Sequence, residues 1–144
     1  AGLSILLSSY YAPNLMIIID EPETNLHPIN QQQIARVLAM MVNKGIKVMI
    51  STHSDYILRE LNNLLMINEL SEEAKAQYAE TGITPEMRLD KDNIGVFHFD
   101  KGGIEAIPID KYGFTIPSID EVITNQNSLQ EALFAQLSKD DEQG

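Results

Sequence analysis

Two short apolar runs flank an amphipathic stretch in the first third of the chain. Residues 15–19 (Leu-Met-Ile-Ile-Ile) show no polar alternation, which is typical of a strand buried on both faces in a parallel sheet. Ile46 to Ser51 is rich in β-branched residues and predicts a second strand. Between the two runs, apolar residues recur at the spacing of one helical face: Ile34, Val37, Leu38 and Met41.

Local sequence signals predict where this helix begins and ends. Pro28 suits the first helical position, Lys44 falls in the last turn, and Gly45 suits the position just beyond. The order strand, helix, strand predicts a right-handed βαβ crossover, in which the two strands are parallel.

Shorter elements are expected in the rest of the chain. We predict a helix from Ser54 to about Asn62, a strand at 64–67, a polar helix at 71–80 that Ser71 caps, and a loop at 83–92. Residues 94–99 and 104–109 flank Asp-Lys-Gly-Gly, which is typical of a β-hairpin, with His98 on its solvent face. Capping-box patterns at 118–121 and 128–131 predict two short helices. The expected fold class is α/β, with parallel strands, a crossover helix, a C-terminal antiparallel hairpin and short helices.

Composition narrows the class of protein. The chain has 144 residues, of which 44% are hydrophobic, so by length we expect one domain with a sizeable core. No apolar run approaches the ~20 residues of a membrane-spanning helix, and no signal peptide is visible. The absence of cysteine excludes disulfides, cysteine metal sites and thiol catalysis. It fits a reducing cytosol, and we expect a cytoplasmic protein without a membrane partner.

The charge of the chain is strongly acidic and uneven. The formal net charge is −11. Residues 1–60 hold four basic and five acidic side chains, whereas residues 61–144 hold six basic and sixteen acidic ones. A nucleic-acid-binding face needs a basic patch, which this sequence lacks. Any contact with DNA or RNA is therefore expected through other regions.

Polar residues follow each of the two expected strands. Asp20 and Glu21 follow the first strand, and Thr52 and His53 follow the second. Parallel strands bring their carboxyl ends to one edge, where ligands bind in open α/β sheets. An aspartate there can support magnesium through the water shell of the ion, an adjacent glutamate can polarise an attacking water, and an imidazole can donate to a phosphate oxygen. The alternative for the acid pair alone is a strand-to-turn junction with solvated carboxylates.

Two segments carry a family resemblance. Residues 15–28, Leu-Met-Ile-Ile-Ile-Asp-Glu-Pro-Glu-Thr-Asn-Leu-His-Pro, resemble the Walker B and D-loop segment of ABC-type ATPases. Residues 48–54, Val-Met-Ile-Ser-Thr-His-Ser, resemble their switch-histidine segment. The form of both motifs is similar to the RecF-like, SMC-like and OLD-like prokaryotic ATPases. The resemblance covers residues 15–54 and implies the C-terminal lobe of a P-loop NTPase-type fold, with ATP and magnesium as cofactors.

The resemblance implies a role for each matching residue. Asp20 matches the Walker B aspartate that supports magnesium, and Glu21 matches the glutamate that activates the lytic water. His53 matches the switch histidine near the γ-phosphate. Asn25, Leu26 and His27 fall in the D-loop, which runs along the dimer interface between two ATP sites. For His27 the structural alternative is a cap for the helix that starts near Pro28.

Two features depart from the family pattern. No Gly-x-x-x-x-Gly-Lys-Ser/Thr loop is present to cradle phosphates. Walker A lies upstream of Walker B in these ATPases, so we expect residues 1–138 to be the C-terminal portion of a nucleotide-binding domain, inactive alone, with 139–144 as a polar tail. The second departure is the signature motif, which should precede the Walker B strand by roughly one helix. Residues 1–10 resemble the end of a helix, but the serine of that motif is not present, so Gly2 is not assigned to it.

The leading hypothesis is an ATPase whose hydrolysis resets a head-to-tail homodimer, in DNA repair or phage defence. Its expected partners are a second copy and its own Walker A-containing part. One alternative is a non-catalytic dimerisation or regulatory lobe that has lost nucleotide binding. Another is a metal-dependent hydrolase that uses Asp20, Glu23, His27 and His53.

Overall fold

The structure is a computed structural model, and it describes the backbone of residues 14–143 and the side chains of residues 14–116 and 121–138. Contacts within the chain divide it into two units. Within the described residues, the first unit comprises 14–95 with Ile109–Gly113, and the second comprises Val96–Pro108 with 114–143. The expected helix end at 1–10 lies outside the described residues.

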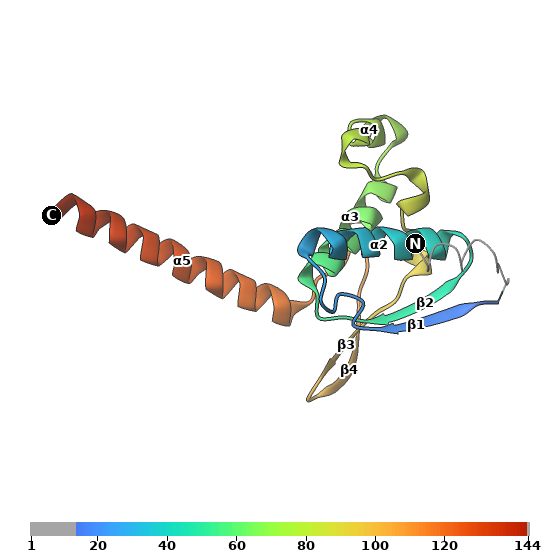
Figure 1. Cartoon of the computed structure of the whole chain (residues 1–144), viewed down its shortest axis with the longest axis horizontal. Coiled ribbons are helices and arrows are strands. Elements are labelled where there is room, and N and C mark those ends of the chain that lie inside the picture. Colours follow the sequence, from blue (N-terminus) through green and yellow to red (C-terminus); the bar gives the residue numbers. More distant parts are fainter. Residues whose placement is uncertain (1–13, 144) are drawn as a thin grey trace. The chain divides into compact units, whose positions relative to one another are not determined.

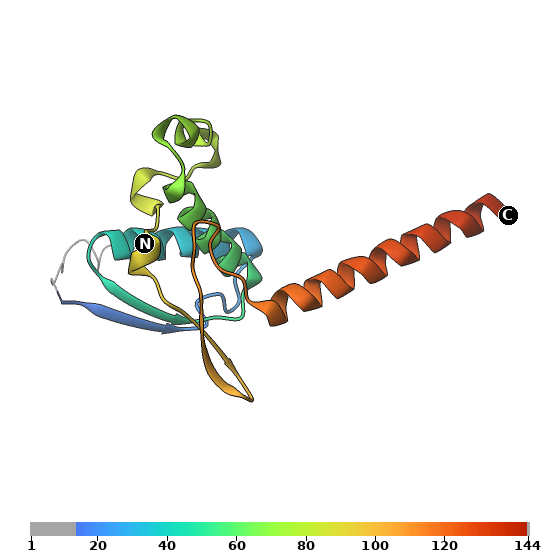
Figure 2. The same cartoon turned by 180° about the vertical axis from the view of Figure 1, so that it is seen from behind.

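The first unit is built on a βαβ crossover. Strands β1 (Met16–Asp20) and β2 (Lys47–Ser51) pair in parallel, in a register that sets Asp20 opposite Ser51. Helix α2 (Pro28–Asn43) lies along one face of this pair in both views (Figures 1 and 2). The helix starts at a proline, and Gly45 follows its cap with a φ of +85°, a conformation that glycine adopts without strain. The predicted βαβ order with parallel strands is thus confirmed.

The sheet is covered on one face only among the described residues. Leu38 and Met41 of α2 pack with Ile46 against a row of side chains from the sheet: Ile17, Ile19, Val48 and Ile50. Met16, Ile18 and Met49 on the opposite face are exposed. The prediction of strands buried on both faces is therefore wrong for the described residues, because alternate side chains point to opposite faces and α2 covers only one of them.

Helix α3 (Asp55–Glu69) is longer than predicted and packs against α2. The predicted strand at 64–67 is wrong, because its residues continue the helical face of Ile57. Leu64 and Leu65 follow Ile57 at i+7 and i+8, and all three are fully buried. Burial of this face keeps the chain helical where a short apolar run also suggested a strand.

The segment after α3 holds short helices. They are α4 (Glu72–Ala76) and three 3₁₀ turns: Ala79–Thr81, Pro85–Met87 and Lys91–Asn93. The polar helix predicted at 71–80 is thus split, and the loop predicted at 83–92 contains single turns. The predicted cap is confirmed, since the Ser71 hydroxyl accepts a hydrogen bond from the Ala74 amide at 3.3 Å.

An ion pair on α4, between a largely buried lysine and an exposed glutamate, makes a pKa shift testable. Lys75 Nζ donates to Glu72 Oε1 at 2.7 Å, and this bond and the lysine charge hold the pKa of Glu72 below its usual value. A carboxylate whose pKa is lower in the folded state stabilises the fold at pH values above its unfolded-state pKa. This contribution to stability is lost as the pH falls through its folded-state pKa. Lys75→Met should return the pKa of Glu72 towards its usual value in a carboxyl NMR titration. Arg88→Gln, which removes a charge 3.9 Å away, should change it less, and the reverse order would contradict the assignment.

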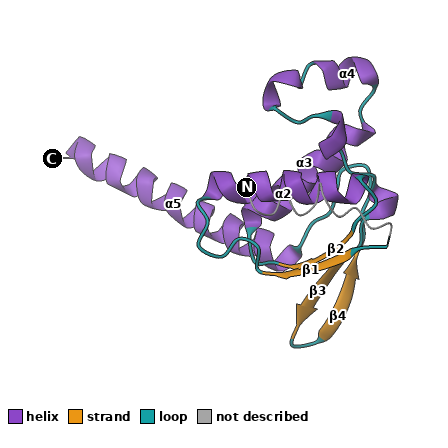
Figure 3. Ribbon diagram, turned by 45° about the vertical axis from the view of Figure 1, so that its right-hand side comes forward, coloured by secondary structure: helices purple, strands orange, loops and turns teal. Residues whose placement is uncertain are grey.

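The second unit contains a hairpin and a long helix. Strands β3 (Val96–Asp100) and β4 (Gly103–Ile107) are antiparallel, which confirms the predicted hairpin (Figure 3). The solvent side of the hairpin differs from the prediction, because Phe97 and Phe99 are exposed and His98 is half-buried.

Helix α5 (Pro117–Gln143) replaces the two predicted C-terminal helices. Residues 118–143 contain neither glycine nor proline, so Ser128 lies in a helix interior despite its capping pattern. The helix includes most of the expected polar tail, from 139 to 143, while the domain division at 138 stays a prediction. Among the described helices, none is both long and apolar enough to cross a bilayer. The mixed α/β class is confirmed, and the P-loop identity of the lobe stays a prediction.

Candidate functional site

The carboxyl ends of β1 and β2 meet at one rim of the first unit. Asp20 and Ser51 are register partners, and the Ser51 hydroxyl donates a short hydrogen bond to Asp20 Oδ1. The backbone amide of Glu21 donates to the Ser51 carbonyl at 3.0 Å, so the pairing extends one residue beyond the strand. These bonds fix the acid pair to the sheet, and both side chains are exposed there.

Glu21 adopts a backbone conformation that is rare for its residue type. Its φ is +46°, in the left-handed region, which costs on the order of 1–3 kcal/mol for a non-glycine residue. The turn that holds it is closed by Thr24, whose amide and hydroxyl donate to the Glu21 carbonyl at 3.1 Å and 2.9 Å. Backbone strain of this kind clusters at functional sites.

His53 lies beside Glu21 although 32 positions separate the two residues in the chain. Its Nε2 is 3.8 Å from Glu21 Oε1, which makes an ion pair when the imidazole is protonated. The His53 side chain is 89% exposed and that of Glu21 is 52% exposed, so both remain accessible to a ligand at the rim. The expected juxtaposition of the acid pair and the imidazole is confirmed, and their catalytic roles stay predictions.

Glu23 holds the segment that contains His53. From the sequence alone, Glu23 is a candidate only as a ligand in the metal-dependent hydrolase alternative. Glu23 Oε1 accepts a hydrogen bond from the His53 backbone amide at 2.7 Å, and Glu23 Oε2 is buried. A second link runs through Gln31, whose Nε2 donates to the Leu26 carbonyl at 2.8 Å and whose Oε1 accepts from the Ser54 hydroxyl at 2.5 Å. The loop after β1 and the segment after β2 are thus connected by two side chains. The role of Gln31 was missed, because its partners lie 5 and 23 positions away and no local pattern marks them.

Removing the Glu23 carboxylate should loosen the His53 segment. A hydrogen bond to a charged acceptor contributes about 1.5–3 kcal/mol, so Glu23→Ala should speed hydrogen exchange of the His53 amide by roughly 10–100-fold. The Ile57 amide, which donates to the Ser54 hydroxyl at 3.1 Å, is the internal control and should keep its rate. Unchanged exchange at His53, measured by NMR, would show that Glu23 does not hold this segment.

The other predicted site residues lie in the loop between β1 and α2. Asn25 is exposed and has a φ of +62°, and Leu26 is half-buried. His27 occupies the N-cap position of α2 but its side chain makes no capping hydrogen bond, so the structural alternative for it is wrong in this respect. The D-loop role of the three residues stays a prediction.

The chemistry of the rim fits magnesium and not a dedicated metal cage. Among the described residues, no group of three or more His, Asp or Glu side chains could hold a metal ion. The metal-dependent hydrolase alternative gains no support from this finding, and Glu23 accepts a hydrogen bond from the backbone of His53. Magnesium retains several waters and needs only one or two carboxylates beside substrate phosphates. The exposed Asp20 carboxylate therefore fits such an ion.

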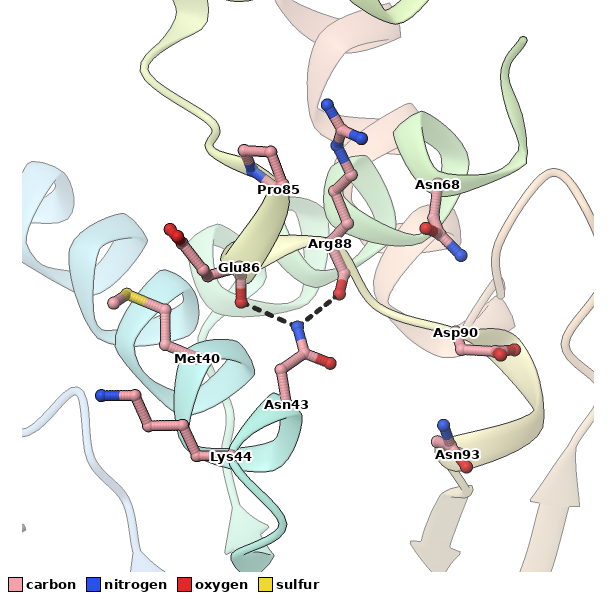
Figure 4. Close-up of a pocket in the computed structure, with 9 residues that line it drawn as sticks. All are labelled: Met40, Asn43, Lys44, Asn68, Pro85, Glu86, Arg88, Asp90 and Asn93. Atoms are coloured by element: carbon pink, nitrogen blue, oxygen red, sulfur yellow. Dashed lines mark hydrogen bonds between the residues drawn. The ribbon is translucent and has the colours of Figure 1, made fainter. Parts of the chain in front are cut away.

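A separate cavity lies at the other end of α2. It has a volume of about 400 Å³ and nine lining residues: Met40, Asn43, Lys44, Asn68, Pro85, Glu86, Arg88, Asp90 and Asn93 (Figure 4). Within it, Asn43 Nδ2 donates to the carbonyls of Glu86 and Arg88, each at 2.7 Å. These bonds tie the segment after α3 to α2. Because α2 begins beside the rim and ends at this cavity, the two sites are distinct.

Comparison with known proteins gives one family match. A family model described as an AAA ATPase domain matches residues 7–58, a range that includes β1, α2, β2 and every predicted site residue. Neither the curated proteins nor the solved structures gave a match. The part of the chain that carries the rim is therefore similar to an AAA ATPase domain, which supports a nucleotide-binding ATPase.

Proposed function

We propose that this chain supplies the Walker B, D-loop and switch-histidine parts of a site that binds and hydrolyses ATP. The observation that carries the proposal is the rim itself. Glu21 and His53 lie 3.8 Å apart beside Asp20, at the carboxyl ends of two parallel strands within the family-matched residues. An accessible acid pair and an imidazole at this edge suit phosphoryl transfer to water.

Each rim residue has one task in this mechanism. Asp20 would hold magnesium, which neutralises phosphate charge when it is bound. Glu21, which lies 3.8 Å from His53, orients and polarises the attacking water. His53 donates a hydrogen bond to a phosphate oxygen and stabilises the charge that develops there. Glu23 keeps the backbone of His53 in position.

The finer parts of the proposal follow from the resemblance to RecF-like, SMC-like and OLD-like ATPases. The Walker A loop belongs to another part of the protein, and Asn25, Leu26 and His27 lie at the interface of an ATP-dependent homodimer. By the same resemblance, this chain acts in DNA repair or phage defence in the cytoplasm. Asp20, Glu21 and His53 together favour hydrolysis over a lobe that has lost nucleotide binding.

Magnesium-dependent ATP binding tests the assignment of Asp20. In the full-length protein, Asp20→Asn should abolish the difference between ATP affinity in magnesium and in EDTA, measured by calorimetry. Asp92→Asn is the control, because Asp92 lies in the 3₁₀ turn Lys91–Asn93, outside the family-matched residues. It should keep the magnesium dependence of the wild type. A magnesium dependence that survives Asp20→Asn would contradict the proposed role.

A further inference from the structure

The β3–β4 hairpin exposes one apolar face. Phe97, Phe99 and Ile104 are 60%, 71% and 68% exposed. They share this face with Ala106, because Phe99 is the register partner of Ile104 and Phe97 is the partner of Ala106. A two-stranded hairpin is at best marginally stable in water without a cover for its apolar face.

Helix α5 exposes a second apolar face. Five of the large apolar side chains that the structure describes on this helix are 56–62% exposed: Val122, Leu129, Leu133, Phe134 and Leu137. At about 100° of rotation per residue they fall within an arc of roughly 140°, and Glu131, the only charged residue between 122 and 138, lies outside it. A face of this width and composition is typical of a helix that packs against a partner.

The two faces belong to the same unit, yet both remain exposed in it. Together they offer eight large apolar side chains per copy. At about 100 Å² each they supply roughly 800 Å² per copy, which is the area that each partner buries in a standard protein interface. Neither face alone reaches that area.

We propose that a second copy of this chain covers both faces, with α5 of each copy packed on the β3–β4 hairpin of the other. In this dimer a two-fold axis relates the two contacts, so that both faces of each copy are covered. Pairing of α5 with α5 is disfavoured by charge, because the helix carries six acidic residues and one lysine, with acidic residues at both ends. The hairpin carries only two acidic residues and one lysine, so it repels α5 less. The interface is independent of the proposed ATPase and needs no nucleotide.

Sedimentation of the full chain without nucleotide tests the interface. We expect a concentration-dependent dimer that strengthens with salt, because each copy carries a net charge of −11. Phe99→Glu on the hairpin and Leu133→Glu on α5 should each raise the dimer Kd by at least roughly 30-fold. Thr124→Glu, on the polar side of α5, is the matched control and should leave the Kd unchanged. Since all three residues are exposed, the far-UV circular dichroism should not change.

Mixing the two variants tests the reciprocal geometry. A heterodimer of Phe99→Glu and Leu133→Glu chains retains one intact contact, between the unaltered hairpin of one chain and the unaltered α5 of the other. Each homodimer retains none. We therefore expect the mixture to form heterodimers at concentrations where each variant alone is monomeric. A wild-type chain that stays monomeric, a Phe99→Glu variant that dimerises normally, or a mixture without recovery would each overturn the proposal.

Discussion

Glu21→Gln in the full-length protein should preserve ATP binding and lower ATP turnover by roughly 10²–10⁴-fold, the usual contribution of a positioned general base. Glutamine has nearly the same shape as glutamate but cannot accept a proton from water. The substitution keeps the hydrogen bonds of the Glu21 backbone to Ser51 and Thr24, so the geometry of the rim should survive. The loss would then report the chemistry of the carboxylate alone, as measured by steady-state phosphate release.

Glu86→Gln is the matched control, because it makes the same chemical change at the cavity beyond the other end of α2. It should leave turnover unchanged. Normal turnover by Glu21→Gln would contradict the role of Glu21. A full-length wild type that neither binds ATP nor releases phosphate would instead favour the non-catalytic regulatory lobe that has lost nucleotide binding.

The predictable part of this fold is the part whose local pattern agrees with its tertiary environment. The βαβ crossover was predictable because a proline, a helical apolar face and a glycine stand in the right order between two β-rich runs. The rim followed from it, since the parallel pairing of Asp20 with Ser51 brings Glu21 and His53 to the same edge.

The failures occurred where local patterns were ambiguous. Leu64 and Leu65 fit a strand as well as a helix, and their burial beside Ile57 decides in favour of the helix. The serine pattern at Ser128 fits a helix start, but nothing in the neighbouring sequence breaks the helix there. The link from Glu23 to His53 spans 30 positions, and such long-range hydrogen bonds leave no periodic trace in the sequence.

Glu60→Ala should destabilise the first unit by about 3–5 kcal/mol, because it leaves the largely buried guanidinium of Arg36, 15% exposed, without its counter-ion. Glu60 is 3% exposed on α3, and its Oε1 accepts from Arg36 Nε of α2 at 2.6 Å. Its other oxygen accepts from Asn63 at 3.2 Å, so both carboxylate oxygens have partners. Arg36 also donates to the Thr81 carbonyl at 3.2 Å, which ties α2 to the segment after α4. Urea denaturation followed by circular dichroism measures the loss.

The control is an ion pair with a similar N–O distance whose side chains are more exposed to solvent. Glu69 and Lys91 lie 2.8 Å apart, with side chains 27% and 36% exposed, so Glu69→Ala should cost at most about 1 kcal/mol. The double variant Arg36→Met with Glu60→Leu should recover most of the stability that Glu60→Ala loses, because apolar side chains of similar size remove the cost of burying charge. If Glu60→Ala costs no more than Glu69→Ala, the buried pair does not hold α2 and α3 together. If the double variant is as unstable as Glu60→Ala, the hydrogen bonds to Asn63 and Thr81 matter more than the charge pair itself.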